Sequence, residues 1–249
     1  MSGELVSLRL LLVAAEPAHA ALWRQCIAQA SVPIEFDACE VPAARAALKV
    51  GGIDICVIDG GLDDADKASV IAAARAKNPE PLVFLSAPRG SARPRDIDGT
   101  LAKPADLIDV RKAVEICIRA RLPTRVLVVD DSDTMRNIVR KILAASRFDL
   151  DVHEAADSGA AFGRLRNGNF AIVFLDHGMP GLNGADILAG IKRVNPEVAV
   201  VMMTTAVDKD APLRPHLAGT LAVLKKPFFP ADVDGVLELF YGLREPDVL

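Results

Sequence analysis

The stretch RVLVVDDSDTMRNIVRKIL, residues 125–143, joins an apolar run to two adjacent aspartates, Asp130 and Asp131. The apolar run does not alternate with polar residues, which is typical of a strand buried on both faces of a parallel sheet. Ser132 or Asp133 can cap the helix that follows. Two carboxylates about 4 Å apart repel each other by a few kcal/mol at a protein-like dielectric. The pair therefore calls for a cation or another partner.

A matching stretch near the N-terminus, RLLLVAAEPAHAALWRQCI at residues 9–27, has Ala14 and Ala15 in the places of the two aspartates. Three more landmarks recur in the same order in each half of the chain. They are IDICVID ending at Asp59 and FAIVFLD ending at Asp176, FLSA with Ser86 and MTTA with Thr205, and AKP with Lys103 and KKP with Lys226. The offsets grow slowly, from 130−14 = 116 through 176−59 = 117 and 205−86 = 119 to 226−103 = 123. Such a drift indicates two copies of one domain with small loop differences.

Strand-like and helix-like stretches alternate within the second copy. Strands are expected near residues 125–129, 150–154, 171–175, 197–203 and 220–224, and helices near 133–146, 157–167, 183–193, 208–218 and 230–242. The order of five strand–helix units in about 120 residues predicts a doubly wound α/β domain with a parallel sheet. The sequence therefore predicts two such domains in tandem.

The seam between the two copies lies at ARLPTRV, where Pro123 cannot continue the preceding helix. This predicts a first domain at residues 1–121 and a second at 122–249, with a linker too short to let them drift apart. Because only residues 243–249 follow the last expected helix, we expect no output domain. A direct contact between the copies, or a homodimer contact made by the first copy, is expected instead.

The composition argues for a well-buried globular protein, with 51% hydrophobic and 25% charged residues. A net charge of −4 argues against nucleic-acid binding, and the longest apolar stretches are too short to span a membrane. LLLVAA followed by AHA imitates a signal peptide, but Glu4 and Glu16 favour a buried first strand. Four cysteines without C-x-x-C spacing are expected to be reduced core residues of a cytoplasmic protein: Cys26, Cys39, Cys56 and Cys117.

The polar landmarks of the second copy all follow expected strands, where the loops of an open parallel sheet form binding sites. Three carboxylates, from Asp130, Asp131 and Asp176, converge there and call for a hard divalent cation such as Mg²⁺. Asp176 can act as a carboxylate nucleophile and form an aspartyl phosphate. Mg²⁺, the Thr205 hydroxyl and the Lys226 ammonium then face the phosphoryl oxygens. A phosphohistidine is the expected donor.

These motifs resemble the receiver domains of bacterial two-component response regulators. The likeness is carried by VLVVDDSDTMRNIVRKIL, FLDHGMPGLNG, VMMTTA and LKKPF, and is greatest to the single-domain chemotaxis type. It covers residues 125–242 and, more weakly, 8–121. It implies tandem flavodoxin-like receiver folds and a sensor histidine kinase or histidine phosphotransfer protein as partner.

The resemblance also implies roles for individual residues. Asp176 is the implied phosphoacceptor, Asp131 a direct metal ligand, and Asp130 a ligand through water. The backbone carbonyl of Gly178 is implied as a further metal ligand, and the Lys226–Pro227 bond as cis. The sequence departs from the family at Val223, where an aromatic switch residue is common, and at Gly178 and Val207, whose side chains cannot align a water for hydrolysis.

The first copy resembles a degenerate receiver. Ala14 and Ala15 leave no pair of metal carboxylates beside Asp59, so its phosphorylation is not expected but stays open. The segment between Ser86 and Lys103 spans 103−86 = 17 positions, against 226−205 = 21 in the second copy, and contains Pro88, Gly90 and Pro94, which disfavour a helix. We therefore expect that this copy has lost its fourth helix.

Each of these residues also has a purely structural interpretation. Taken alone, an acidic pair after a strand is more often a helix N-cap cluster than a metal site. His177 is expected to be an exposed loop residue, Trp23 a packing residue, and His19, His153 and His216 show no ligand spacing. Two rival functions are a phosphate-independent adaptor and a Mg²⁺-dependent phosphatase with an aspartate nucleophile. The phosphatase class usually has its two aspartates in one D-x-D motif, whereas 176−131 = 45 residues separate them here.

Overall fold

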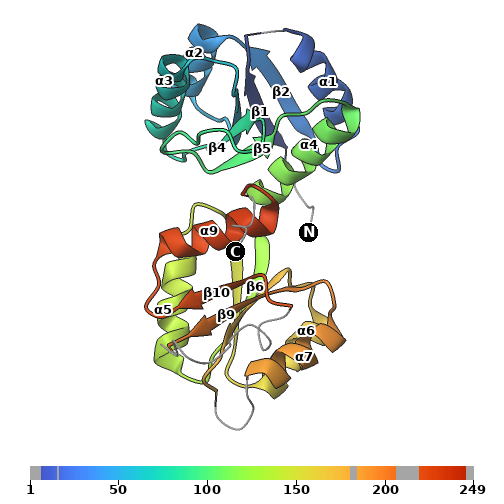
Figure 1. The fold of residues 1–249 in the computed structure, drawn as a ribbon, viewed down its shortest axis with the longest axis vertical. Coiled ribbons are helices and arrows are strands. Elements are labelled where there is room, and N and C mark those ends of the chain that lie inside the picture. Colours follow the sequence, from blue (N-terminus) through green and yellow to red (C-terminus); the bar gives the residue numbers. More distant parts are fainter. Residues whose placement is uncertain (1–6, 16, 180–183, 206–218, 245–249) are drawn as a thin grey trace. The chain divides into compact units, whose positions relative to one another are not determined.

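The computed structural model describes residues 7–15, 17–179, 184–205 and 219–244. Its contacts divide the chain into two compact units, Met1–Arg121 with Tyr241–Leu249, and Leu122–Phe240 (Figure 1). The boundary at Arg121 and Leu122 lies at the seam expected from the sequence. The expected second domain, in contrast, ran to residue 249, whereas the units group the segment from Tyr241 onward with the first.

The first unit is a five-stranded sheet with helices on its two faces. Its elements are β1 (Leu8–Val13), α1 (Pro17–Ile27), β2 (Ile34–Cys39), α2 (Val41–Val50), β3 (Ile55–Asp59), α3 (Asp64–Arg75), β4 (Leu82–Ala87), β5 (Gly99–Ala102) and α4 (Leu107–Arg121). The strand order is β2-β1-β3-β4-β5, and every pairing is parallel. Helix α1 packs beside α4 and α2 beside α3, on opposite sides of the sheet (Figure 1).

No helix forms between β4 and β5, where residues 88–98 are all described. Pro88 and Pro94 cannot donate backbone hydrogen bonds to a helix, and Gly90 has a positive φ of 75°. The expected loss of the fourth helix in this copy is confirmed.

The second unit repeats the same plan. Its described elements are β6 (Thr124–Val129), α5 (Asp133–Ala144), β7 (Leu150–Ala155), α6 (Ser158–Asn167), β8 (Ile172–Asp176), α7 (Gly184–Val194), β9 (Ala199–Thr204), β10 (Ala222–Lys225) and α9 (Pro230–Tyr241). The sheet order is β10-β9-β8-β6-β7, again with parallel pairings only. The predicted parallel α/β fold is confirmed for both units, while the helix expected at 208–218 lies outside the described residues.

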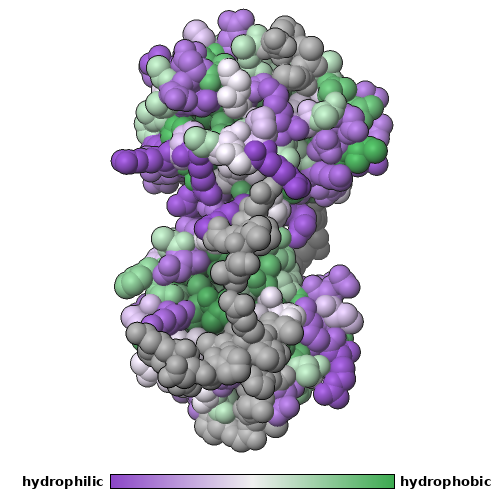
Figure 2. Space-filling view, viewed as in Figure 1, coloured by the Kyte–Doolittle hydropathy of each residue, from purple (hydrophilic) through white to green (hydrophobic). Residues whose placement is uncertain are grey.

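The sequences of the central strands are continuous apolar runs because these strands are buried on both faces. All five residues of β3 and of β8 are buried, whereas the edge strands β2 and β7 are partly exposed. On the face drawn in Figure 2, hydrophilic residues cover much of the described surface of both units, with apolar residues scattered between them. The core therefore lies between the sheets and their helices, as expected of sheets covered on both faces.

The helix ends in the second unit are fixed by short polar side chains. Ser132 Oγ accepts a hydrogen bond from Met135 N at 3.3 Å, so Ser132 and not Asp133 caps α5. At the far end of α5, the buried Asp234 of α9 accepts hydrogen bonds from Ser146 Oγ at 2.6 Å and Arg147 Nε at 3.0 Å. These bonds tie two helices of the second unit together on one side of its sheet.

The cysteines are free thiols, as expected, and three of the four are buried. Burial, with a smaller contribution from Cys39, raises the pKa of Cys56 to about 12, and burial also raises the pKa of Cys117. Such thiols pack as small apolar groups. Cys39 is half-buried, which departs from the expected core position. Among the described residues, no helix is both long and apolar enough to cross a membrane.

Candidate functional site

The candidate site lies where the strand order of the second unit reverses. The chain leaves β6 toward α5 on one side and leaves β8 toward α7 on the other, so a crevice opens at the carboxyl ends of these adjacent strands. Asp130 follows β6 directly, and Asp176 is the last residue of β8. The topology thus brings together carboxylates that are 176−130 = 46 residues apart in the sequence.

Three carboxylates gather at this point. Asp130, Asp131 and Asp176 each offer an oxygen within 4.8 Å of those of the other two. Asp130 is 1% exposed and Asp176 9%, whereas Asp131 is exposed. Buried carboxylates this close are tolerated only with a compensating positive charge.

Lys226 supplies part of that charge. Its Nζ donates hydrogen bonds to Asp130 Oδ2 at 2.8 Å and to Asp176 Oδ1 at 2.9 Å. Burial lowers the pKa of Lys226, but the hydrogen bonds to the two aspartates outweigh it, so the pKa is raised above its ordinary value. The ammonium is therefore charged near neutral pH. Three carboxylates and one ammonium give a formal local charge of −3 + 1 = −2.

A net charge of −2 with all-oxygen donors fits a divalent hard cation. The ligand chemistry suits Mg²⁺, which prefers carboxylate oxygens and keeps several waters. The exposed Asp131 gives the cluster a side open to solvent. Asp130 is additionally fixed by its own loop, because Ser132 N donates to Asp130 Oδ1 at 3.0 Å.

A buried arginine supports the acidic pair from beneath, and sequence reasoning missed it. Arg136 on α5 is 9% exposed, and its Nη1 donates to the backbone oxygen of Asp130 at 2.7 Å. Its guanidinium also forms ion pairs with Asp133 and with Glu154 on β7, the latter at 3.3 Å. The signal in the sequence is spacing, because Arg136 precedes Val139 and Leu143 on the buried face of α5.

The other residues predicted for the site differ in their exposure and in their contacts with this cluster. Thr205 directly follows β9 and is exposed, and no contact with Asp176 is described for it. Lys226 N donates to Thr204 O at 2.7 Å, which aligns the ends of β9 and β10. Gly178 is exposed, and the Lys226–Pro227 bond is cis, as the resemblance implied. Val207 lies outside the described residues.

His177 differs from its expected exposed position. It is half-buried, its backbone N–H donates to Met203 O at 2.9 Å, and its Nδ1 is buried without a hydrogen-bond partner among the described residues. The backbone bond to the neighbouring strand holds the residue against the sheet end. A position next to a strand end therefore does not by itself place a side chain in solvent.

The equivalent region of the first unit is already neutral. Lys103 Nζ donates to Asp59 Oδ1 at 3.1 Å, and Gly61 N donates to the same oxygen at 2.8 Å. Asp59 pairs in register with Ser86 across β3 and β4. Ala14 and Ala15 contribute no charge, so one carboxylate and one ammonium sum to −1 + 1 = 0.

Little space is left in that region of the first unit. The cavity that Asp59, Ser86 and Lys103 line has a volume of about 20 Å³, and Trp23 of α1 forms part of its wall. Trp23 is 3% exposed and stacks on Phe36, with ring centroids 6.5 Å apart. The packing role expected for Trp23 is confirmed, and the cavity beside Asp59 is small.

Comparison with known proteins agrees with this geometry. The sequence model of the family described as "Response regulator receiver domain" matches residues 126–238. Chemotaxis protein CheY1 of Helicobacter pylori is 32% identical over 124 residues, which cover 49% of this chain and 99% of that protein. Chemotaxis protein CheY of Pseudomonas aeruginosa is 32% identical over 106 residues, covering 42% of this chain and 85% of that protein.

One solved structure is similar over nearly the whole chain. A two-component system response regulator/GGDEF domain protein matches 94% of this chain and 99% of its own, with 22% identity and a TM-score of 0.50. At that identity the likeness concerns the fold alone.

Two doubly wound parallel sheets, one of them with an acidic cluster at its switch point, define a tandem pair of receiver-type domains. The chain belongs to the response regulator receiver domain family, and it is a response regulator with tandem receiver domains. Its second unit is a phosphorelay receiver of the CheY type.

Proposed function

We propose that this response regulator accepts one phosphoryl group on Asp176 from the phosphohistidine of a sensor kinase or phosphotransfer protein, with Mg²⁺ at Asp130 and Asp131. The observation that carries the proposal is the sharing of Lys226 between Asp130 and Asp176 in a cluster of net charge −2. Such a cluster attracts a divalent cation, and the bound cation together with Lys226 can then hold the anionic phosphoryl group beside Asp176.

Asp176 performs the bond-forming step in this proposal. One of its carboxylate oxygens attacks the phosphorus, the bond from phosphorus to the histidine nitrogen breaks, and the nitrogen keeps the electron pair. The other ring nitrogen of the phosphohistidine carries a proton in the reacting form, so the products are an aspartyl phosphate and a neutral histidine on the donor. Asp176 is the last residue of the fully buried strand β8, which positions its carboxylate at the sheet end.

The neighbouring residues supply positive charge and positions. Lys226 already lies 2.9 Å from Asp176 Oδ1, within reach of a phosphoryl oxygen bound there. Thr205 follows the neighbouring strand and offers a hydroxyl at the same sheet end. Mg²⁺, when bound, neutralises charge on the transferring group, and the Gly178 carbonyl is a candidate for one of its ligands.

The product is a signal rather than a released compound. Phosphorylation adds a charge of about −1.5 to −2 at the acceptor. We propose that this shifts an existing conformational equilibrium of the second unit and is read through protein contacts, without turnover of an independent substrate. The first unit is proposed to serve as a surface for response, since its own acidic end is neutral and closed.

The test is phosphotransfer to the full chain from a phosphorylated histidine phosphotransfer protein, with Mg²⁺ present. Wild-type protein should gain an acid-stable, hydroxylamine-sensitive label, and Lys226→Met should reduce its rate by two orders of magnitude or so because the phosphoryl oxygens lose their ammonium. Lys225→Met, at the adjacent position, is the matched control. A chain that never labels while melting normally would be the phosphate-independent adaptor instead.

A further inference from the structure

Every polar group of Asp130 has a hydrogen-bond partner. Its N–H donates to Ala155 O at 3.2 Å, and its carbonyl accepts from Arg136 Nη1 at 2.7 Å. Its carboxylate accepts from Ser132 N on Oδ1 at 3.0 Å and from Lys226 Nζ on Oδ2 at 2.8 Å. The strand β7, the helix α5, the turn before α5 and the end of β10 thus all hold this one residue.

Asp131, the exposed member of the acidic pair, is held through its backbone alone. Within the described part of the chain its side chain forms no hydrogen bond or ion pair, although an oxygen of it lies within 4.8 Å of oxygens of Asp130 and Asp176. Asp131 N shares one planar peptide group with Asp130 O, so Arg136 fixes the plane of that group. On the other side, the bond from Ser132 N to Asp130 Oδ1 fixes the next peptide group. The two planes together set the direction in which the Asp131 side chain leaves the backbone.

Arg136 is itself firmly placed. Its side chain is 11% exposed, its Nε pairs with Glu154 Oε2 on β7 at 3.3 Å, and its Nη2 pairs with Asp133. Three acceptors around one guanidinium match the fixed fork of N–H donors that this group presents. A buried charge held in this way cannot turn toward another acceptor without leaving a partner unpaired. The contact with Asp130 O is therefore a fixed feature of the site.

The first unit lacks this arginine together with the acidic pair. Ala20 occupies the fourth position of α1, as Arg136 does in α5, and Ala38 occupies the position of Glu154 in the second strand. The first unit nevertheless forms the same five-stranded parallel sheet, and Ala20 is buried in it. The arginine is therefore not required for this fold, and within this chain it occurs only with the acidic pair.

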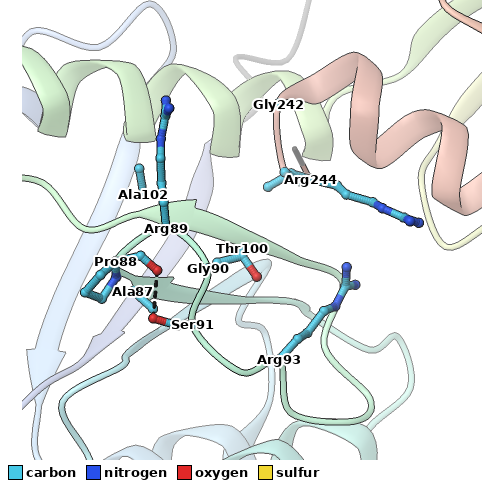
Figure 3. Close-up of a pocket in the computed structure, with 11 residues that line it drawn as sticks. Ala87, Pro88, Arg89, Gly90, Ser91, Arg93, Thr100, Ala102, Gly242 and Arg244 are labelled. Carbon is cyan, nitrogen blue, oxygen red and sulfur yellow. Dashed lines mark hydrogen bonds between the residues drawn. The ribbon is translucent and has the colours of Figure 1, made fainter. Parts of the chain in front are cut away.

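Three other arginines, in the first unit, do not converge on one group. They line a cavity of about 580 Å³ beside β5, where Arg89, Arg93 and Arg244 point in different directions (Figure 3). The backbone sets one wall of this cavity, because Thr100 N donates to Leu243 O at 2.8 Å. These side chains define no common binding point, unlike the groups that meet at Asp130.

We propose that Arg136 is a positioning residue for the metal site, because its bond to the Asp130 carbonyl holds the Asp130–Asp131 peptide and keeps Asp131 within reach of the other two carboxylates. The inference rests on the Mg²⁺ site of the proposed function and adds the residue that orients its exposed ligand. Arg136 contacts neither the metal nor the phosphoryl group in this role. Glu154 in turn holds Arg136, so the edge strand β7 takes part in placing the ligand.

Positioning and simple charge predict opposite effects for the loss of Arg136. By charge alone, removal of a cation beside the acidic cluster makes the local potential more negative and should strengthen Mg²⁺ binding. If Arg136 positions Asp131, its removal frees the peptide group and should weaken Mg²⁺ binding instead. The expected size is on the order of tenfold, as for other partners that orient metal ligands. The direction of the change therefore separates the two roles.

The experiment is titration of the full chain with MgCl₂, followed by isothermal calorimetry at a temperature where circular dichroism shows each variant to be folded. Arg136→Met should raise the dissociation constant for Mg²⁺ about tenfold. Arg140→Met is the matched control, because Arg140 lies one turn further along α5 and pairs with the same Glu154 at 3.3 Å, but has no described bond to Asp130. It should leave the constant unchanged or slightly lower. A merely structural loss would lower the melting temperature without changing this constant.

A double-mutant cycle tests whether Arg136 acts through Asp131. In Asp131→Asn the side chain keeps an oxygen but loses its charge, so Mg²⁺ should bind more weakly than to the wild type. Adding Arg136→Met should then change the dissociation constant by less than about twofold, because the carboxylate that Arg136 places is already gone. If Arg136→Met does not fold, Arg136→Lys takes its place. It keeps the charge without the planar fork and should also weaken Mg²⁺ binding.

The role of Arg136 is overturned by any of three results: Mg²⁺ binding that Arg136→Met leaves unchanged or strengthens, equal weakening by Arg140→Met, or a full effect of Arg136→Met in the Asp131→Asn background. Wild-type affinity in Arg136→Lys, where that variant is the one used, has the same meaning. A wild-type chain that binds no Mg²⁺ would overturn the metal site of the proposed function, and this inference with it. The two failures can therefore be told apart.

Discussion

The two units end their sheets in opposite electrostatic states although they share one plan. In the second, three carboxylates and Lys226 leave a charge of −2, whereas in the first Asp59 and Lys103 cancel. The lysine is present in both. The difference lies in two residues after the first strand, Asp130 and Asp131 against Ala14 and Ala15.

This difference shows what the acidic pair does. With the pair, the lysine is shared between two carboxylates and a formal charge of −2 remains. Without it, the lysine forms an ion pair with Asp59 at 3.1 Å beside a cavity of about 20 Å³. On this comparison, the first unit keeps the parallel sheet and the lysine but lacks the carboxylates that would hold a cation.

The largest expected effect is on phosphorylation itself. Asp176→Asn should abolish phosphoryl uptake, while Asp59→Asn should leave it nearly unchanged, because only Asp176 belongs to the charged cluster. Intact-mass spectrometry after phosphotransfer should find one phosphoryl group in the wild type and in Asp59→Asn, and none in Asp176→Asn. Two phosphoryl groups in the wild type would show that the neutral first site is active and would break the comparison.

The second effect is stabilisation by Mg²⁺, confined to the second unit. An ion at about 100 times its dissociation constant adds about 2.7 kcal/mol to the free energy of unfolding. The chain has one tryptophan, Trp23, which is buried in the first unit, so its fluorescence reports unfolding of that unit alone. Mg²⁺ should raise the calorimetric transition of the second unit more than the Trp23 transition.

The control for this effect is Asp131→Ala, which removes the exposed carboxylate of the cluster. Its Mg²⁺-dependent shift should shrink strongly, and its melting without metal should be unchanged or higher because repulsion is relieved. Equal shifts of both transitions in the wild type would mean that the units unfold together or that the first also binds metal.

Much of this comparison was predictable from sequence because strand ends and polar landmarks coincide. The order of Asp130, Asp176 and Lys226 after apolar runs predicted a shared edge, and parallel topology then brought them within 4.8 Å or into hydrogen bonds. The missing helix followed from prolines that cannot donate backbone hydrogen bonds. Local chemistry was sufficient in these cases.

The rest depended on contacts that no local pattern encodes. The return of Leu243 to β5 joins residues 243−100 = 143 positions apart, and it hinges on Gly99 lacking a side chain. His177 is half-buried because its backbone bonds to Met203 on another strand. Arg136 was overlooked because a charged residue at apolar spacing is usually assigned to the solvent face.

The third effect concerns that arginine. Arg136→Ala should lower the free energy of unfolding of the second unit by about 3 kcal/mol, because it leaves the buried Asp130 carbonyl without this donor and removes one of the two arginines that pair with Glu154. Arg140→Ala, which removes an exposed partner of the same Glu154, should cost about 0.5 kcal/mol. Urea unfolding followed by far-ultraviolet circular dichroism measures both. Equal costs would show that Arg136 acts only as a surface charge.

The smallest expected effect comes from transferring the acidic pair to the first unit. Ala14→Asp with Ala15→Asp changes the local charge from 0 to −2, since Asp59 and Lys103 remain. Mg²⁺ should then bind and change the Trp23 fluorescence, because Trp23 lines the same small cavity as Asp59. The affinity for Mg²⁺ should be lower than at the acidic cluster of the second unit, since the surrounding wall is already packed.

Ala14→Asn with Ala15→Asn is the control of similar shape without charge, and its Trp23 fluorescence should show no response to Mg²⁺. The transferred pair should bring no phosphorylation of Asp59, because the cavity beside it is small and Pro88 follows β4 where the second unit has the hydroxyl of Thr205 after β9. If the aspartate variant gives no fluorescence response to Mg²⁺, then packing around Trp23, and not the missing charge, prevents metal binding in the first unit.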